Sequence, residues 1–206
     1  MMNVQVGIVN LAAGNTKSVS RAVEFFLPEH KLIDSSDQLA GCTHLIIPGV
    51  SNFGSVVNEL HSKNLFKPLQ SLFGGNKKIM GLCAGMQVMG ISSDESPGKS
   101  GFSWFNYRVK SLVNFNNKKL FHTGWNSVGS KQNASELIMM KGNFYFNHSY
   151  YVSKSDCEFE EFGISRFSDY EIISIFMDSN VLGVQFHPEK SQKSGLKLLR
   201  SFLEWK

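Results

Sequence analysis

One segment near the middle of the chain constrains the fold most strongly: Lys78-Ile-Met-Gly-Leu-Cys83-Ala-Gly85-Met-Gln87. The apolar run at 79–82 is typical of a buried strand, and the residues after Cys83 favour a helix that begins at once. Cys83 is therefore expected at a strand-to-helix joint, where Gly81 and Gly85 leave space around its side chain. The start of a helix also stabilises a thiolate, so the segment predicts a nucleophile elbow.

A buried structural cysteine in a glycine-rich turn would produce the same local pattern, so a catalytic interpretation needs a base elsewhere. His187-Pro188-Glu189 supplies one, directly after the apolar run at 181–186. Pro188 fixes its φ at about −65°, which gives the two flanking side chains a set relative direction. Cysteine hydrolases and transferases need a base and a group that orients it. Cys83, His187 and Glu189 are therefore the predicted catalytic residues.

The order of the predicted elements indicates an α/β fold. We expect strands at 4–10, 31–34, 44–47, 79–82 and 181–186, and helices at 18–27, 55–64, 68–73, after Cys83 and at 193–205. This alternation favours a mostly parallel central sheet flanked by helices, with functional loops at the carboxyl ends of its strands. Short aromatic-rich segments predict an additional antiparallel β section at 107–115, 119–122, 143–152 and 172–177.

Composition narrows the class of protein further. A chain of 206 residues with 42% hydrophobic content can bury one core but is short for two domains of about 150 residues each, so we expect a single domain over 1–206. The net charge of +4 comes without any block of like charges, which argues against a nucleic-acid partner. The sequence contains neither an apolar run long enough to span a membrane nor a signal-peptide pattern, so we expect a cytoplasmic protein.

The three cysteines, Cys42, Cys83 and Cys157, lack C-x-x-C spacing. An odd number without that spacing indicates neither a disulfide framework nor a thiolate zinc site, and we expect no metal and no cofactor.

The two catalytic segments resemble the class I (triad) glutamine amidotransferases, and the resemblance covers nearly the whole chain. Three further segments are similar to the glutaminase subunit of imidazole glycerol phosphate synthase, an enzyme of histidine biosynthesis: Pro48-Gly-Val-Ser-Asn-Phe-Gly54, His122-Thr-Gly-Trp-Asn126 and His148-Ser-Tyr150. The resemblance implies that Cys83 attacks the side-chain amide of L-glutamine, giving a glutamyl thioester and ammonia, and that water then releases glutamate.

The resemblance also implies roles for residues outside the triad. Stabilisation of the oxyanion would fall to the backbone at Gly49, Val50 and Ala84. The amino-acid end of the substrate would be held by Gln87, by Glu95, which suits its ammonium, and by the backbone of Ser149 and Tyr150. The interface with a (β/α)₈-barrel cyclase subunit, into which ammonia passes, would include Trp125, Asn126, Tyr145 and Lys190.

The sequence departs from the family pattern in its first loop, Asn10-Leu-Ala-Ala-Gly14, which is usually richer in glycine, and at two further positions. Ser51 stands where the oxyanion loop usually has glycine, which alone adopts positive φ freely, and Phe121 stands where proline usually precedes His122. These departures also fit a paralogous amidotransferase that supplies ammonia for amidation of a surface-polysaccharide sugar. Two further alternatives are a stand-alone Cys-His-Glu peptidase or amidase and a non-catalytic interaction subunit.

Overall fold

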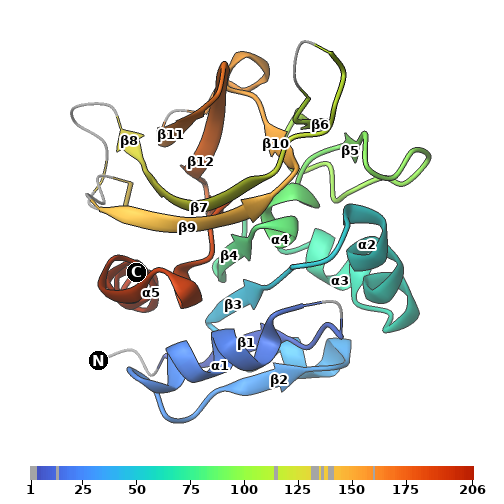
Figure 1. The fold of residues 1–206 in the computed structure, drawn as a ribbon. Helices are drawn as coiled ribbons and strands as arrows, with labels where there is room; N and C mark the ends of the chain where they lie inside the picture. Colours follow the sequence, from blue (N-terminus) through green and yellow to red (C-terminus); the bar gives the residue numbers. More distant parts are fainter. Residues whose placement is uncertain are drawn as a thin grey trace.

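A computed structural model of the chain describes residues 4–12, 14–113, 116–130, 135, 137–138, 142–159 and 161–206 (Figure 1). Its main feature is an eight-stranded sheet. In spatial order the strands are β2 (Lys31–Ile33), β1 (Val6–Val9), β3 (His44–Ile47), β4 (Lys78–Leu82), β13 (Val181–Val184), β12 (Tyr170–Asp178), β11 (Glu161–Phe167) and β8 (Gly129–Ser130). The strands from β2 to β13 pair in parallel, and the pairs from β13 to β8 are antiparallel.

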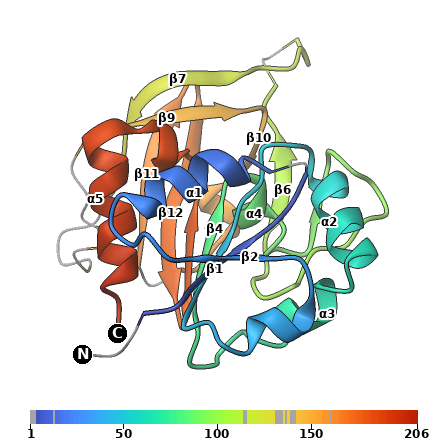
Figure 2. The same cartoon turned by 90° about the horizontal axis from the view of Figure 1, so that it is seen from below.

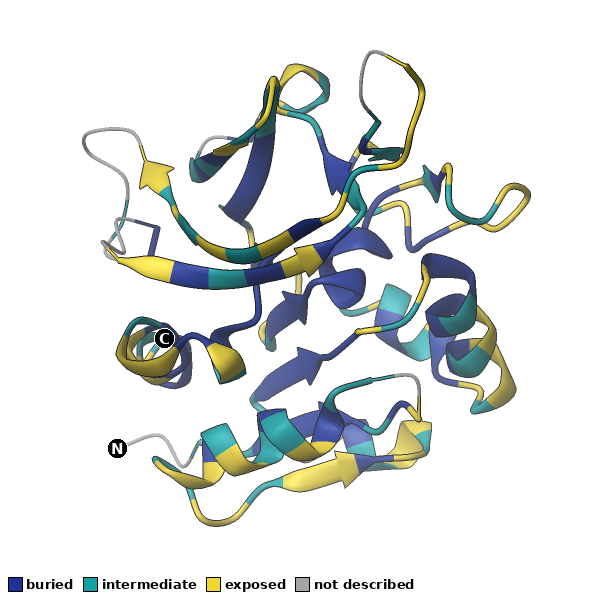
Figure 3. Ribbon diagram, viewed as in Figure 1, coloured by how far each residue is buried: buried dark blue, intermediate teal, exposed yellow. Residues whose placement is uncertain are grey.

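Helices cover both faces of the parallel part of the sheet. One face carries α1 (Thr16–Glu24) and α5 (Gln192–Leu203), which lie side by side in Figure 2, and the other carries α2 (Phe53–Ser62), α3 (Phe66–Gln70) and α4 (Ala84–Gln87). Because successive strand residues point to opposite faces, Ile46 of β3 packs with the first set while Leu45 and Ile47 pack with the second. Figure 3 shows the central strands buried and the edge strand β2 largely exposed.

Among the described residues, two smaller sheets complete the fold. One contains β10 (Tyr150–Val152), β6 (Arg108–Ser111) and β5 (Ser92–Ser93), and the other is a two-stranded ribbon of β7 (His122–Ser127) and β9 (Asn143–His148). Short 3₁₀ helices are η1 (Ser36–Leu39), η2 (Lys154–Asp156) and η3 (Pro188–Lys190). The ribbon is bonded to the segment after β13, because the Tyr145 carbonyl accepts from the His187 N–H at 2.9 Å. No helix among the described residues is long and apolar enough to cross a membrane.

The predicted fold class is confirmed. The helix predicted at 68–73 is α3, two residues earlier than expected at its start and three at its end, and the larger errors lie in the β-rich second half. The strand expected at 143–152 is two strands, β9 and β10, in different sheets, with Ser149 between them. The strand expected at 119–122 is wrong, because β7 begins only at His122. The strand β11 was not predicted, since its glycine, serine and charged residues interrupt the apolar pattern. Of the strand expected at 107–115, the last two residues lie outside the described residues.

The elbow depends on close contact between backbone segments. A Cβ on Gly85 would lie 1.9 Å from the Ile47 carbonyl oxygen of β3, and one on Gly81 would lie 2.8 Å from the Gly85 oxygen. The helix that follows Cys83 is only one turn long, shorter than the sequence suggested. Glycine at both positions therefore lets α4 pack directly against β3 and β4.

We expect Gly85→Ala to destabilise the protein by at least about 3 kcal/mol, because the added methyl group meets backbone atoms that cannot rotate away. Urea denaturation would measure the change in the free energy of unfolding. Gly41→Ala is the matched control, because its Cβ would approach only the flexible end of Lys31, at 3.3 Å, and should change stability by less than about 0.5 kcal/mol. Equal stability of the two variants would contradict this account of the elbow.

Candidate active site

The positions of Cys83 and His187 follow from the pairing of two neighbouring strands. β4 and β13 are parallel with Leu82 opposite Val184, so the residues that follow each strand emerge at the same edge of the sheet. The Cys83 N–H donates to the Val184 carbonyl at 2.7 Å, which joins the elbow to the segment that carries the histidine. Cys83 has φ 51° and ψ −109°, a conformation that is strained for any residue except glycine.

His187 and Glu189 form a buried hydrogen-bonded pair. The Nδ1 of His187 lies 2.9 Å from Oε1 of Glu189, and the two side chains are 2% and 1% exposed. Burial lowers the pKa of His187, but the charge of a Cys83 thiolate, a hydrogen bond to that sulfur and the Glu189 carboxylate together raise it to about 10. The pKa of Glu189 is lowered overall: burial raises it, and the hydrogen bond and charge of His187 lower it by more. This arrangement favours the imidazolium form of His187, held in place by the Glu189 carboxylate.

Asn15 also contacts Glu189 of the predicted triad, although Asn15 itself was not predicted. Its Nδ2 donates to Oε1 of Glu189 at 2.7 Å from the loop that precedes α1. Oε2 of Glu189 has no hydrogen-bond partner among the described residues. Asn15 is therefore placed to fix the carboxylate oxygen that orients His187, and only the tertiary fold brings it there from 174 positions away.

A cavity of about 290 Å³ opens above Cys83. The β3–α2 loop, α4, the segment before β7 and the β9–β10 junction form its walls. Its lining residues are Val50, Ser51, Asn52, Cys83, Ala84, Gln87, Glu95, Lys119, Phe121, Asn147, His148, Ser149 and Tyr150. The structure thus brings all four residues of the predicted substrate-binding set to the same cavity as the elbow.

Gln87 is committed to other protein groups. Its Nε2 donates to the Tyr150 carbonyl at 2.9 Å and to Oε1 of Gln185 at 3.1 Å. Gln185 was not predicted as a site residue, yet it is fully buried and its Nε2 lies 3.4 Å from the sulfur of Cys83. Gln87 therefore supports the cavity wall and the nucleophile, and both of its N–H groups are used.

Charged groups of opposite sign face the cavity. Oε2 of Glu95 accepts from the Phe53 N–H at the start of α2, at 2.9 Å. Burial raises the pKa of Glu95, while that hydrogen bond and the charge of Lys119 act in the opposite direction. Lys119, which was not predicted, donates to the Tyr150 hydroxyl at 3.1 Å and lies 4.4 Å from the centre of its ring. One carboxylate and one ammonium group suit the two charged ends of a free amino acid.

The predicted oxyanion groups are bonded to each other. The Ala84 N–H donates to the Gly49 carbonyl at 3.3 Å, so in this conformation it does not point to a free site. A Cβ on Gly49 would lie 2.6 Å from the Gly85 N, which explains the need for glycine there. Ser51 does not have positive φ in this conformation. An oxyanion hole at this loop therefore requires the peptide between Gly49 and Val50 to rotate.

The four residues expected at a partner interface lie outside the cavity. Trp125 is 50% exposed and meets Tyr145 edge to face at 6.0 Å, and Lys190 lies 5.8 Å from the Tyr145 ring. These three form a surface cluster on the ribbon and η3. Asn126 points elsewhere: its Nδ2 donates to Nε2 of His122 at 3.1 Å and to the Arg166 carbonyl at 2.9 Å. The two-residue period of a strand, which puts Asn126 on the face opposite Trp125, could have predicted this.

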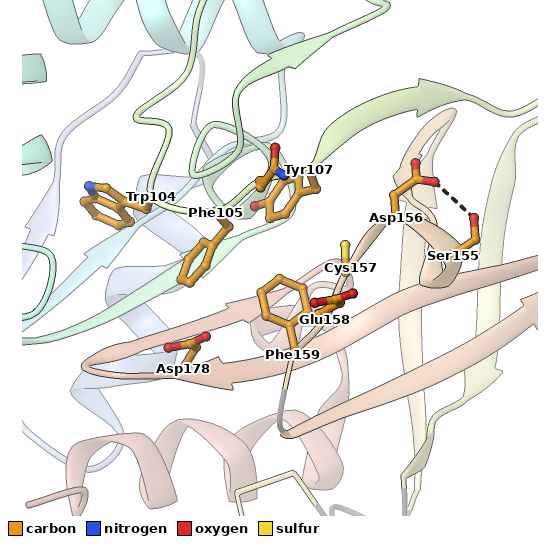
Figure 4. Close-up of a pocket in the computed structure, with 10 residues that line it drawn as sticks. Trp104, Phe105, Tyr107, Ser155, Asp156, Cys157, Glu158, Phe159 and Asp178 are labelled. Carbon is orange, nitrogen blue, oxygen red and sulfur yellow. Dashed lines mark hydrogen bonds between the residues drawn. The ribbon is translucent and has the colours of Figure 1, made fainter.

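A second cavity, of about 440 Å³ (Figure 4), has no residue of the elbow in its lining. Aromatic rings and carboxylates surround it, and Cys157 lies among them. Burial raises the pKa of Cys157 to about 12 and also raises that of Cys42, so both thiols stay protonated near neutral pH. Cys83 remains the candidate nucleophile. The described residues include no group of three or more histidine, cysteine, aspartate or glutamate side chains able to hold a metal ion.

Comparison with known proteins agrees with this geometry. Residues 7–205 match the glutamine amidotransferase class-I family. The chain is 34% identical to the imidazole glycerol phosphate synthase subunit HisH of Leptospira interrogans, over 96% of this chain and 98% of that one. It is 35% identical to the subunit of the same name from Pyrococcus furiosus, over 96% and 97% of the two chains.

Solved structures share the fold at lower identity. A crystal structure of a glutamine amidotransferase superimposes with a TM-score of 0.69 at 20% identity, covering 97% of both chains. The structure of PurLQS from Thermotoga maritima gives 0.69 at 17% identity, covering 98% of this chain and 99% of that one. The family match over nearly the whole chain, together with the two relatives above 30% identity, shows that this chain belongs to the class-I glutamine amidotransferases.

Proposed function

We propose that the chain is the glutaminase subunit of an imidazole glycerol phosphate synthase. It hydrolyses L-glutamine to glutamate and ammonia as a single domain, and ammonia passes to a (β/α)₈-barrel cyclase subunit. The observation that carries the proposal is the buried pairing of His187 with Glu189 at the edge of the sheet where Cys83 emerges. The names of the relatives, at 34% and 35% identity over nearly their full length, support the choice of synthase.

The proposed mechanism uses the triad in both half-reactions. The Cys83 sulfur, deprotonated by His187, attacks the amide carbon of glutamine and forms a tetrahedral intermediate. His187 then gives its proton to the leaving nitrogen, which departs as ammonia and leaves a glutamyl thioester. In the second step His187 takes a proton from water, whose oxygen attacks the thioester carbon. The carbon–sulfur bond then breaks, His187 returns the proton to the Cys83 sulfur, and glutamate is released. Glu189 keeps the Nδ1–H tautomer and stabilises the imidazolium throughout.

If Cys83 is the nucleophile, Cys83→Ala should lower glutamate release at least about a thousandfold, because no other group can form the thioester. Release of glutamate from glutamine, measured with the cyclase subunit present, tests this. Cys157→Ala is the control and should keep the wild-type rate, since Cys157 is half-buried and lines a different cavity from Cys83. Full activity in the Cys83 variant would overturn the mechanism.

The charges at the cavity suggest how glutamine is held by its amino-acid end. We propose that Lys119 binds the α-carboxylate while Glu95, bonded to the start of α2, faces the ammonium. Among the described residues that line the cavity, Lys119 is the one lysine or arginine.

Lys119→Met should therefore raise the KM for glutamine roughly 10- to 100-fold, the cost of losing a hydrogen bond to a charged group. The kcat should change by less than about threefold, since the reacting amide lies at the other end of the substrate. Lys118→Met is the neighbouring control, because Lys118 does not line the cavity. A fall in kcat with an unchanged KM would contradict this assignment.

The closed oxyanion loop suggests that the isolated subunit turns over slowly. Freeing the Ala84 N–H requires rotation of the peptide that follows Gly49, and that rotation changes φ of residue 50. A β-branched valine resists positive φ, whereas glycine adopts it without strain. Val50 is 49% exposed, so its substitution removes little buried surface.

Val50→Gly should consequently raise glutaminase turnover without the partner at least about threefold, with a smaller gain when the cyclase subunit is bound. Val50→Ala tests the same position with its Cβ kept, and it should stay close to wild type. Steady-state glutamate release with and without the partner measures both effects. A slower glycine variant would show that rotation at residue 50 does not limit turnover.

The identity of the partner subunit and of its product tests the proposed pathway. Purification from the native host should recover a barrel subunit whose presence raises glutamine hydrolysis and whose product contains the amide nitrogen of glutamine. Recovery of a sugar-amidating partner instead would favour the alternative acceptor suggested by Ser51 and Phe121.

A further inference from the structure

Two buried histidines outside the triad form a pair between the strands of the ribbon. His122 of β7 and His148 of β9 occupy opposed positions, and they are 3% and 8% exposed. Nδ1 of His122 lies 3.0 Å from Nε2 of His148. Neither side chain has a role in the chemistry proposed above, although His148 reaches the wall of the cavity.

The partners of this pair determine which nitrogen carries each proton. Nδ1 of His148 lies 2.9 Å from the Tyr150 carbonyl, which can only accept, so that nitrogen carries the hydrogen. Nε2 of the neutral ring must then accept, and His122 donates to it from Nδ1. Nε2 of His122 accepts in turn from Nδ2 of Asn126, whose orientation is fixed independently because Oδ1 accepts from the Ser127 N–H at 2.8 Å. Every donor in this chain meets an acceptor.

Packing and burial keep both rings neutral and in place. His122 is stacked between the rings of Phe146 and Phe167, each with its centre 4.4 Å away and nearly parallel. Burial lowers the pKa of His122 to about 4. Burial also lowers the pKa of His148 to about 3, and the positive charge that His122 would carry if protonated acts in the same direction. Protonation of either ring would also place two donors against each other or against Asn126.

The chain of hydrogen bonds continues to the nucleophile. The Tyr150 carbonyl accepts from His148 and from Gln87, Gln87 also donates to Gln185, and Gln185 donates to the Cys83 sulfur. Asn126 at the other end neighbours Trp125, one of the residues of the surface cluster. A continuous series of bonds, in which the donors on both sides converge on the Tyr150 carbonyl, therefore joins the ribbon to the thiol.

We propose that His122 and His148 are positioning residues that hold the Tyr150 carbonyl, and through it Gln87 and Gln185, in the arrangement that aligns Cys83 with a bound glutamine. The ribbon thereby sets the geometry of the substrate cavity. Asn126 is the residue at the outer end of the series of hydrogen bonds. This inference rests on the proposed function, because it concerns the alignment of that nucleophile with that substrate. Phenylalanine in place of His122 would satisfy the stacking between the two aromatic rings, so packing alone does not require a histidine.

The test uses His122→Phe, which keeps the stacked ring, and Asn126→Leu, which keeps the size of the side chain and removes its donor. His61→Phe is the control, since His61 is exposed and stacks on Phe66 far from this chain of bonds. Two reagents probe Cys83: the glutamine mimic 6-diazo-5-oxo-L-norleucine, which must bind in the cavity, and iodoacetamide, which needs only a reactive thiol. Thermal unfolding within a few degrees of wild type shows that each variant is folded.

We expect labelling by the glutamine mimic to fall at least about tenfold in His122→Phe and about threefold or more in Asn126→Leu. Labelling by iodoacetamide should change less than threefold, and the control should match wild type with both reagents. Wild-type rates for the mimic in both variants would overturn the inference while leaving the glutaminase proposal intact. Failure of the mimic to label the wild-type protein, which reacts with iodoacetamide, would instead count against the proposed function.

Nitrogen-15 NMR of the imidazoles gives a readout that a purely structural role would not require. Both His122 and His148 should be neutral Nδ1–H tautomers at pH 7, the less common form for histidine in water. In Asn126→Leu the nitrogen-15 chemical shift of the His122 Nε2 should change to that of an imidazole nitrogen without a hydrogen bond. His148 should keep its tautomer. An Nε2–H tautomer or a charged ring at either position in the wild type would overturn the assigned direction of the chain.

Discussion

The parallel register of β4 with β13 is the constraint on which the site depends. It brings together Cys83 and His187, which are 104 positions apart in the sequence. The reason is that the strands before them end side by side, with Leu82 paired to Val184. Cys83 emerges within one residue of that pair, and its N–H bonds the neighbouring carbonyl. A shift of one residue in this pairing would turn the alternating side chains of β13 to the opposite face and move the loop that carries His187. The positions of Cys83 and His187, the predicted nucleophile and base, therefore depend first on the register of the sheet and only then on the loops that carry them.

The same constraint explains which parts of the site were predictable from sequence. Cys83 and His187 each follow an apolar strand, so their chemistry and their common edge can be read from local patterns. Lys119 could not be found in this way, since it reaches the cavity only because the segment before β7 bends over the elbow. Asn15 and Gln185 are polar residues whose importance appears only from their partners, Glu189 and the Cys83 sulfur. Parallel α/β elements were predicted well, whereas the β-rich half was not, because its strands belong to three sheets and carry weak alternation.

Two separate sets of hydrogen bonds connect the ribbon of β7 and β9 to the residues around the candidate site. The first set involves the backbone of Tyr145. Its carbonyl accepts from the His187 N–H, and its N–H donates to the Ser191 hydroxyl. The second set involves side chains, and it passes through the pair His122 and His148 to the cavity wall. The segment that carries His187 and the cavity wall beside Cys83 are thus supported by the same two strands, so a displacement of the ribbon would alter both together. Such a shared support is consistent with activity that depends on what occupies the exposed face.

The backbone of Cys83 has a consequence for how this protein can be changed. A non-glycine residue at φ 51° costs roughly 1–3 kcal/mol, which the surrounding contacts must supply. Selection for stability alone would favour glycine at this position, and selection for turnover opposes it. A lineage that no longer needed ammonia would therefore be expected to lose the elbow cysteine early, before the buried glycines around it, because its loss relieves the fold while theirs would damage it.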